Sequence, residues 1–133
     1  MDDKYFCHKS TGTLCFDPKQ GTKHFEDWWA IVFCDNEIVR YYCWHLQRWG
    51  RPVVPNKLWN AHISAIKGER PLNKSLWGGK MYNVEFWYAH TVRMDNKKHA
   101  WVDVYSPQLR QIRIDLGLKV ERDRFHMTIG MLQ

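Results

Sequence analysis

The sequence lacks several features that would place it in a membrane or secretory class. No run of about 18 apolar residues occurs in it, so no membrane-spanning helix is predicted. Its first ten residues, MDDKYFCHKS, contain acidic side chains and no apolar stretch of the kind that a signal peptide requires. The four cysteines show no C-x-x-C spacing, which argues against a zinc ribbon or a dithiol redox motif. We therefore expect reduced thiols and a cytoplasmic protein.

The sequence also lacks linkers, low-complexity stretches and an excess of acidic residues. Without a break in composition, residues 1–133 are expected to form a single domain that is long enough to bury a core. The 20 basic residues outnumber the 14 acidic ones, and the net charge of +6 favours anionic partners such as nucleotides. Tryptophan is abundant instead. Of the eight tryptophans, four lie in apolar runs and are expected in the core: Trp28, Trp29, Trp44 and Trp49.

The first half of the chain predicts a strand, a helix and a second strand. Residues 28–34 (WWAIVFC) are a short apolar run rich in β-branched and aromatic side chains, which indicates a buried strand. Asp35 or Asn36 can cap the helix that follows, and Gly50 ends it. A proline-containing loop then leads to a strand within residues 60–68 (NAHISAIKG).

The second half repeats this order. Residues 100–105 (AWVDVY) alternate as a strand, Ser106 caps a helix, and Gly117 ends that helix. A polar loop leads to a strand within residues 124–132 (RFHMTIGML). We interpret the shared order as a weak internal duplication about a pseudo-two-fold axis.

Two further segments complete the expected architecture. Residues 82–92 form a strand that pairs antiparallel with 100–105 through the turn MDNKKH, and residues 12–16 add an edge strand. The predicted fold class is α+β: a bilobal arrangement of antiparallel sheets flanked by helices, with the internal duplication. The final strands of the two halves should then lie close to the pseudo-two-fold axis.

Each of these final strands carries the motif H-x-[ST], as His62-x-Ser64 in the first half and His126-x-Thr128 in the second. Side chains two positions apart on a strand point to the same face, with Cα atoms about 6.5 Å apart. Each strand therefore has one apolar face for the core and one polar face with an imidazole and a hydroxyl. If the strands are neighbours, two imidazoles and two hydroxyls converge on one pocket.

A third match, His8-Lys9-Ser10, shows that the bare pattern is weak evidence. It lies in the polar stretch CHKSTGT, which predicts a loop or a frayed end. A histidine on a half-buried strand is usually structural. The matched position of the other two motifs in two similar halves is what favours catalysis.

Two imidazoles suit the cleavage of a phosphoester, because one can accept a proton from the nucleophile while the other donates one to the leaving oxygen. Hydroxyl groups can donate to the phosphate oxygens as charge develops. We predict four catalytic residues, with no metal and no cofactor: His62, Ser64, His126 and Thr128. Zinc is disfavoured since each motif supplies one imidazole and a neutral hydroxyl, and a serine nucleophile is disfavoured since no G-x-S-x-G elbow occurs. Which histidine is the acid and which the base stays open.

Four further side chains are candidates for binding the substrate. Lys67 and Arg70 follow the first motif and can contact an anion, although solvated turn charges are the alternative. Trp77, beside two glycines and two lysines, can stack on a base, with a core position as the alternative. Trp87 is a second candidate for stacking.

The two motifs resemble those of the 2H phosphoesterase superfamily, which is named for them and has a duplicated bilobal fold. The similarity covers about residues 12–133, but its specific part is the two tetrapeptides HISA and HMTI. A narrower resemblance, to the phage anti-CBASS proteins once labelled Swiss-army-knife RNA-repair-like proteins, rests on TGTLCFDP, WWAIVFC, HISAIKGERP and GLKVERDRFHMTIG. Ser64, where Thr is common, and the short tail after Thr128 depart from that pattern.

The narrower resemblance implies a metal-independent phosphodiesterase that hydrolyses cyclic di- and trinucleotide signals, as a phage counter-defence against CBASS immunity in the host cytoplasm. Its partner would be the cyclic oligonucleotide substrate, with no membrane and no stable protein partner. Two alternatives remain open: an RNA repair enzyme for 2′,3′-cyclic phosphate ends, and a module that sequesters a nucleotide without cleaving it. The paired histidines separate the module from an enzyme, because binding alone needs no matched imidazoles.

We predict that His62→Ala and His126→Ala each lower the rate of phosphodiester cleavage by roughly 10²- to 10⁴-fold, the usual contribution of a positioned acid or base. Ser64→Ala and Thr128→Ala each remove one phosphate donor and should cost less in the same steady-state assay. His8→Ala, from the third match, is the control and should retain the wild-type rate. An equal loss in His8→Ala would contradict the distinction between the three motifs.

Overall fold

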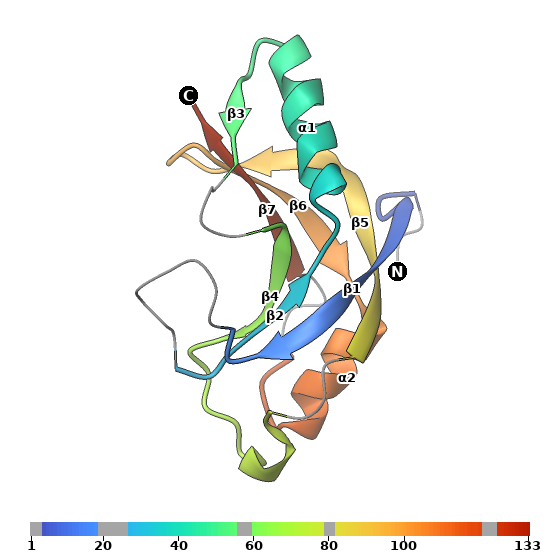
Figure 1. Cartoon of the computed structure of the whole chain (residues 1–133), viewed down its shortest axis with the longest axis vertical. Helices are drawn as coiled ribbons and strands as arrows, with labels where there is room; N and C mark the ends of the chain where they lie inside the picture. Colours follow the sequence, from blue (N-terminus) through green and yellow to red (C-terminus); the bar gives the residue numbers. More distant parts are fainter. Residues whose placement is uncertain (1–3, 19–26, 56–59, 79–81, 121–124) are drawn as a thin grey trace.

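The computed structural model describes residues 4–18, 27–55, 60–78, 82–120 and 125–133 (Figure 1). Its strands are β1 (His8–Phe16), β2 (Trp29–Phe33), β3 (Val53–Val54), β4 (His62–Lys67), β5 (Tyr82–Met94), β6 (His99–Tyr105) and β7 (Phe125–Leu132). Its helices are α1 (Asn36–Arg48), α2 (Pro107–Asp115) and a short 3-10 helix, η1 (Lys74–Leu76). The described chain is therefore mainly β-structure with two short α-helices.

The strands form one antiparallel sheet that closes on itself. Six of them follow the order β7-β4-β2-β1-β5-β6, and β6 pairs again with β7, which completes the ring. The short strand β3 lies alongside β7, with Val53 opposite Leu132 and Val54 opposite Met131. The architecture is a closed six-stranded antiparallel β-barrel.

This architecture overturns the predicted fold class. We expected an α+β, bilobal arrangement of antiparallel sheets flanked by helices, and the strands instead form one closed barrel accompanied by two short helices. The reason is that β7 pairs on both edges, with β6 from His99 to Val104 and with β4 at Ile63. Half-buried strands alternate in the same way in an open sheet and in a barrel, so periodicity in the sequence does not reveal the closure.

The two helices lie at opposite ends of the molecule, α1 at the top of the view and α2 at the bottom (Figure 1). Each begins at a predicted cap: the Asp35 carboxylate accepts from the Glu37 amide, and the Ser106 hydroxyl accepts from the Leu109 amide. Buried side chains of both helices, such as Tyr42 and Leu109, join the core cluster formed by the strands. Within the described ranges, no helix is long and apolar enough to cross a bilayer.

Two tryptophans that were expected in the core lie on the surface. Trp44 and Trp49 are 54% and 74% exposed, whereas Trp29 of β2 is 7% exposed. The buried positions of α1 are Val39, Tyr42 and Leu46. Trp44 falls on the opposite face of this helix because of the 3.6-residue period, so an apolar residue in a helical run does not by itself indicate burial.

The stretch that carries His8 is a strand and not the loop that its polar composition predicts. Strand β1 begins at His8 and pairs with β2 on one side and β5 on the other, so the prediction of an edge strand is also wrong. The part around His8 pairs with β5, from His8 opposite Tyr88 to Leu14 opposite Tyr82, and ladder hydrogen bonds between backbone groups form there although the side chains are polar. His8 Nε2 lies 3.1 Å from His90 Nδ1 of β5.

We predict that Gly130→Ala destabilises the protein by about 2 kcal/mol, because β3 approaches β7 too closely for a side chain at this position. A Cβ at Gly130 would lie 2.2 Å from the carbonyl oxygen of Val54 and 2.9 Å from Val53 Cγ1. The measurement is the free energy of unfolding from urea denaturation. In the control Gly50→Ala, the new Cβ meets nothing within 4 Å, and the φ of +75° alone should cost about 1 kcal/mol. Equal losses in the two variants would contradict the close approach.

Candidate active site

The two H-x-[ST] motifs face each other across the β4–β7 pair. Their central residues, Ile63 and Met127, lie directly opposite each other, and both are fully buried in the core. In an antiparallel pair, the residues on either side of Ile63 lie opposite the residues on either side of Met127, so each imidazole is opposite the hydroxyl residue of the other motif. The cross-strand pairs are His62 with Thr128 and Ser64 with His126. Because side chains alternate along a strand, these four side chains project from the outer face of the barrel.

A groove on this outer face has the motifs at its centre. One pocket of about 480 Å³ is lined by all four motif side chains together with Lys67, Arg113 and Lys119. A second pocket of about 870 Å³ shares three of the motif side chains and Lys67, and it extends to Asn60 and the start of α1. The motif residues therefore lie where two neighbouring pockets meet.

His62 is held by the backbone and has a cation nearby. Its Nδ1 donates to the carbonyl oxygen of Asn60 at 2.8 Å. Burial lowers the pKa of His62, and the charge of Lys67 lowers it further, against the opposing effect of the Asn60 hydrogen bond. The indole of Trp29 lies edge-on to the imidazole at 6.4 Å between centroids and donates to Ser64 Oγ at 3.4 Å. His62 is therefore neutral at pH 7 and suited to accept a proton.

His126 is held by a carboxylate. Its Nδ1 lies 3.3 Å from Asp103 Oδ1, and the register of β6 and β7 pairs these two residues directly. The indole of Trp101 lies edge-on to the imidazole, with 5.7 Å between centroids. The two imidazoles thus have the same arrangement of contacts, because each is held through Nδ1 and flanked by a tryptophan. With Nδ1 engaged in each ring, Nε2 is the nitrogen that can exchange a proton with a substrate.

Asp103 is a functional candidate that the sequence analysis missed. It is fully buried and accepts hydrogen bonds from the Tyr5 hydroxyl at 2.7 Å, from Arg93 Nη1 at 3.2 Å and from Trp101 Nε1 at 3.3 Å. Burial acts to raise the pKa of Asp103, but the hydrogen bonds from Tyr5 and Arg93 and the charge of Arg93 outweigh it and lower the pKa. The available signal was a single carboxylate within the apolar alternation AWVDVY.

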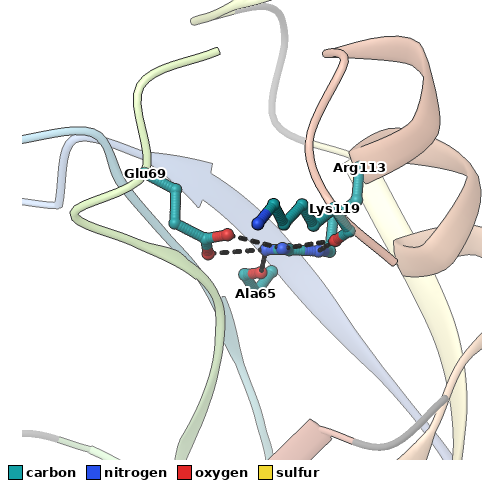
Figure 2. Close-up of polar contacts among 4 residues, drawn as sticks. All are labelled: Ala65, Glu69, Arg113 and Lys119. Carbon is teal, nitrogen blue, oxygen red and sulfur yellow. Dashed lines mark hydrogen bonds and ion pairs between the residues drawn. The ribbon is translucent and has the colours of Figure 1, made fainter. Parts of the chain in front are cut away.

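Arg113 of α2 forms one wall of the first pocket and was also missed. Its guanidinium lies between the carboxylate of Glu69 and the carbonyl oxygen of Lys119 (Figure 2). Nη1 and Nη2 donate to Glu69 at 2.8 and 2.6 Å, and Nη1 also donates to the carbonyl oxygen of Ala65 in β4 at 3.0 Å. These bonds connect α2 to β4 and to the segment after β4. Arg113 therefore stabilises the pocket wall, and its position on a short helix gave no signal of this role.

Of the four predicted substrate-binding residues, the structure brings Lys67 to the groove, where it lines both pockets. Arg70, Trp77 and Trp87 line neither of the two pockets. Trp77 is partly buried against the core, and Trp87 lies on β5. Lys119, which the sequence analysis did not single out, joins Lys67 in the first pocket. Positive charge thus reaches the groove from two separate segments of the chain.

The side chains of the groove offer proton transfer by two imidazoles with hydroxyl donors between them. No three His, Cys, Asp or Glu side chains in the described part of the chain are arranged to hold a metal ion. Comparisons of the chain with protein-family models, curated proteins and solved structures find no match. The function is therefore argued from the geometry of the groove.

We predict that Arg113→Gln lowers the free energy of unfolding by about 2 kcal/mol, since its carboxylate and carbonyl partners lose a charged donor. Arg40→Gln in α1 is the matched control. Arg40 also pairs with a glutamate, Glu37, but both side chains are exposed, and such a pair contributes at most about 1 kcal/mol. Urea denaturation at pH 7 measures both losses. Equal losses would contradict the role of Arg113 in the pocket wall.

The destabilisation by Arg113→Gln should shrink in acid. The hydrogen bond from Arg113 lowers the pKa of Glu69, against the opposing effect of burial. A carboxyl group with a lowered pKa stabilises the fold fully above its unfolded value, about 4.3, and this stabilisation is lost as the pH falls through the lower folded value. The same denaturation series at pH 7 and pH 3 measures the change, and an undiminished difference at pH 3 would contradict the pairing.

Proposed function

We propose that this protein is a metal-independent phosphodiesterase that cleaves cyclic oligonucleotides at their 3′,5′ linkages. The observation that carries the proposal is the β4–β7 register, which sets two imidazoles and two hydroxyls opposite each other at the centre of one groove. A site that only binds a nucleotide requires no such pair of proton-transfer groups. The same pair of motifs is the feature that resembles the 2H phosphoesterases.

The phosphate of the substrate is expected between the two motifs. Ser64 and Thr128 supply hydroxyl donors for its non-bridging oxygens. Lys67 and Lys119 line the same pocket and supply positive charge for the anion. Arg113 stabilises the pocket wall but adds little net positive charge to the pocket, because its guanidinium is paired with the carboxylate of Glu69.

The proposed reaction begins with attack by a ribose 2′-hydroxyl on the adjacent phosphorus. One imidazole takes the proton of this hydroxyl, the 2′ oxygen bonds to phosphorus, and the bond from phosphorus to the 5′ oxygen breaks. The other imidazole donates a proton to the 5′ oxygen, so the ring opens to a linear nucleotide with a 2′,3′-cyclic phosphate and a 5′-hydroxyl. Hydrolysis of this cyclic phosphate by water, with the two imidazoles in exchanged roles, returns the pair to its original protonation state.

The two pockets favour a substrate that continues on both sides of the phosphate. Their volumes of about 480 and 870 Å³ are those of small-molecule sites, and the motif residues lie where the pockets meet. A cyclic di- or trinucleotide has a nucleoside on each side of every phosphate and so can occupy both. If a phage encodes the protein, this reaction would remove, in the host cytoplasm, the signal on which CBASS immunity depends.

We predict that several cyclic di- and trinucleotides are opened, and that a ring with a 2′-deoxyribose at its scissile 3′-linked position is not, because it lacks the attacking hydroxyl. Chromatography and mass spectrometry of the products measure both outcomes. Equal cleavage of the ribose and deoxyribose rings would identify water as the nucleophile and contradict the proposed step.

RNA ends that carry 2′,3′-cyclic phosphates are the comparison substrate in the same assay. Cleavage of these ends with no ring opening would support the RNA repair alternative. Tight binding of the rings with no product from either substrate would support a sequestering module.

A further inference from the structure

The two imidazoles of the groove have opposite electrostatic surroundings. His126 contacts the buried carboxylate of Asp103 at 3.3 Å. His62 instead donates to a neutral backbone carbonyl and has the ammonium group of Lys67 nearby. A carboxylate stabilises an imidazolium, whereas a cation and a neutral carbonyl in a buried setting favour the neutral ring. The local symmetry of the motifs is therefore broken by the groups around each ring.

We propose that Asp103 is a positioning residue that orients His126 through Nδ1 and gives its imidazolium form a carboxylate partner, so that His126 is the general acid of the groove and His62 its general base. This inference rests on the phosphodiesterase activity proposed above and assigns the direction of proton transfer within it. In ring opening, His62 Nε2 accepts the proton of the 2′-hydroxyl. His126 Nε2 donates a proton to the 5′ oxygen as the bond from that oxygen to phosphorus breaks.

The hydrogen bonds of Asp103 fix both its charge and its orientation. Oδ2 accepts from the Tyr5 hydroxyl and from Arg93 Nη1, while Oδ1 accepts from Trp101 Nε1 and faces His126 Nδ1. Donors on both oxygens stabilise the carboxylate despite its burial. The same donors prevent rotation of the carboxylate, and this in turn fixes the orientation of the imidazole.

Other charged groups around His126 act less directly. Those that line the first pocket are Lys67, Glu69, Arg113 and Lys119. The carboxylate and the guanidinium among them pair with each other, and the two ammonium groups oppose an imidazolium. Arg93 binds the other oxygen of Asp103 and offsets part of its charge. Among the residues that the structure describes, Asp103 is the carboxylate that contacts the His126 imidazole, and its charge favours the imidazolium over the neutral ring.

The first test compares Asp103→Asn with Asp95→Asn in the full chain. Asp95 is a matched control, because its carboxylate contacts the imidazole of His99 at 3.1 Å and neither residue lines the groove. We expect Asp103→Asn to lose roughly tenfold or more in kcat at pH 8, with the alkaline limb of its pH–rate profile moved to lower pH, because the imidazolium of the general acid loses its carboxylate partner. KM should change little, since no substrate contact is lost. Asp95→Asn should follow the wild-type profile.

The variant Arg93→Gln gives a second readout of opposite sign. The Arg93 side chain is 51% exposed, so its loss leaves the core in place even if Asp103→Asn fails to fold. Without the guanidinium, the charge of Asp103 acts more strongly on His126, and the alkaline limb should move to higher pH. If the cluster has only a structural role, Asp103→Asn and Arg93→Gln should both lower the rate without moving the alkaline limb in opposite directions. That result would overturn the inference.

Nitrogen-15 NMR of the imidazole rings gives a measurement that needs no turnover. At pH 7 we expect a larger fraction of His126 than of His62 to carry protons on both ring nitrogens. In Asp103→Asn, the fraction of His126 that is doubly protonated should be smaller than in the wild type. If Asp103→Asn matches Asp95→Asn in both its spectrum and its pH profile while His126→Ala is inactive, the inference fails and the proposed function stands. If His62→Ala and His126→Ala keep full activity, the proposed function itself fails.

Discussion

Strand β7 pairs along both of its edges, and both the barrel and the groove require this double pairing. Its contact with β6 closes the barrel, and its contact with β4, at Ile63 and Met127, brings the second H-x-[ST] motif beside the first. The same strand therefore completes the core and carries half of the groove. A change that separated β7 from β4 would open the barrel and also part the two imidazoles, so the stability of the fold and the geometry of the groove are coupled at this seam.

The imidazoles and hydroxyls of the two motifs lie on the outer face of the barrel. Alternation directs apolar side chains of β4 and β7 into a filled interior, so the imidazoles and hydroxyls project from the opposite face. A small barrel has an interior that its own side chains fill, which leaves no room for a ligand there. The pockets are bounded instead by the start of α1 and by Lys119 after α2. The two helices thus cover the core and also shape the groove.

Much of this organisation was predictable from particular residues. The apolar run before Asp35 and the alternation before Ser106 indicated strands, and both residues cap the helices that follow, as predicted. These features depend on hydrogen bonds and periodicities between residues that are close in the chain, so local patterns encode them. The same reasoning was wrong for His8, Trp44 and Trp49, because the pairing of His8 with the distant strand β5 and the choice of which face of α1 meets the core are not local properties.

Local sequence patterns were enough to predict the order of the six barrel strands and the two α-helices, their caps, and an imidazole and a hydroxyl on one face of each motif strand. Strand β3, by contrast, lies in a stretch that was predicted as a loop. Long-range strand pairing then closes the sheet into a barrel, sets His62 opposite Thr128 and brings Asp103 into contact with His126. The physical reason is that strand register joins residues far apart in the chain, and many registers are compatible with the same alternation. The charges that distinguish the two imidazoles come from such distant segments, so their different surroundings are a property of the fold.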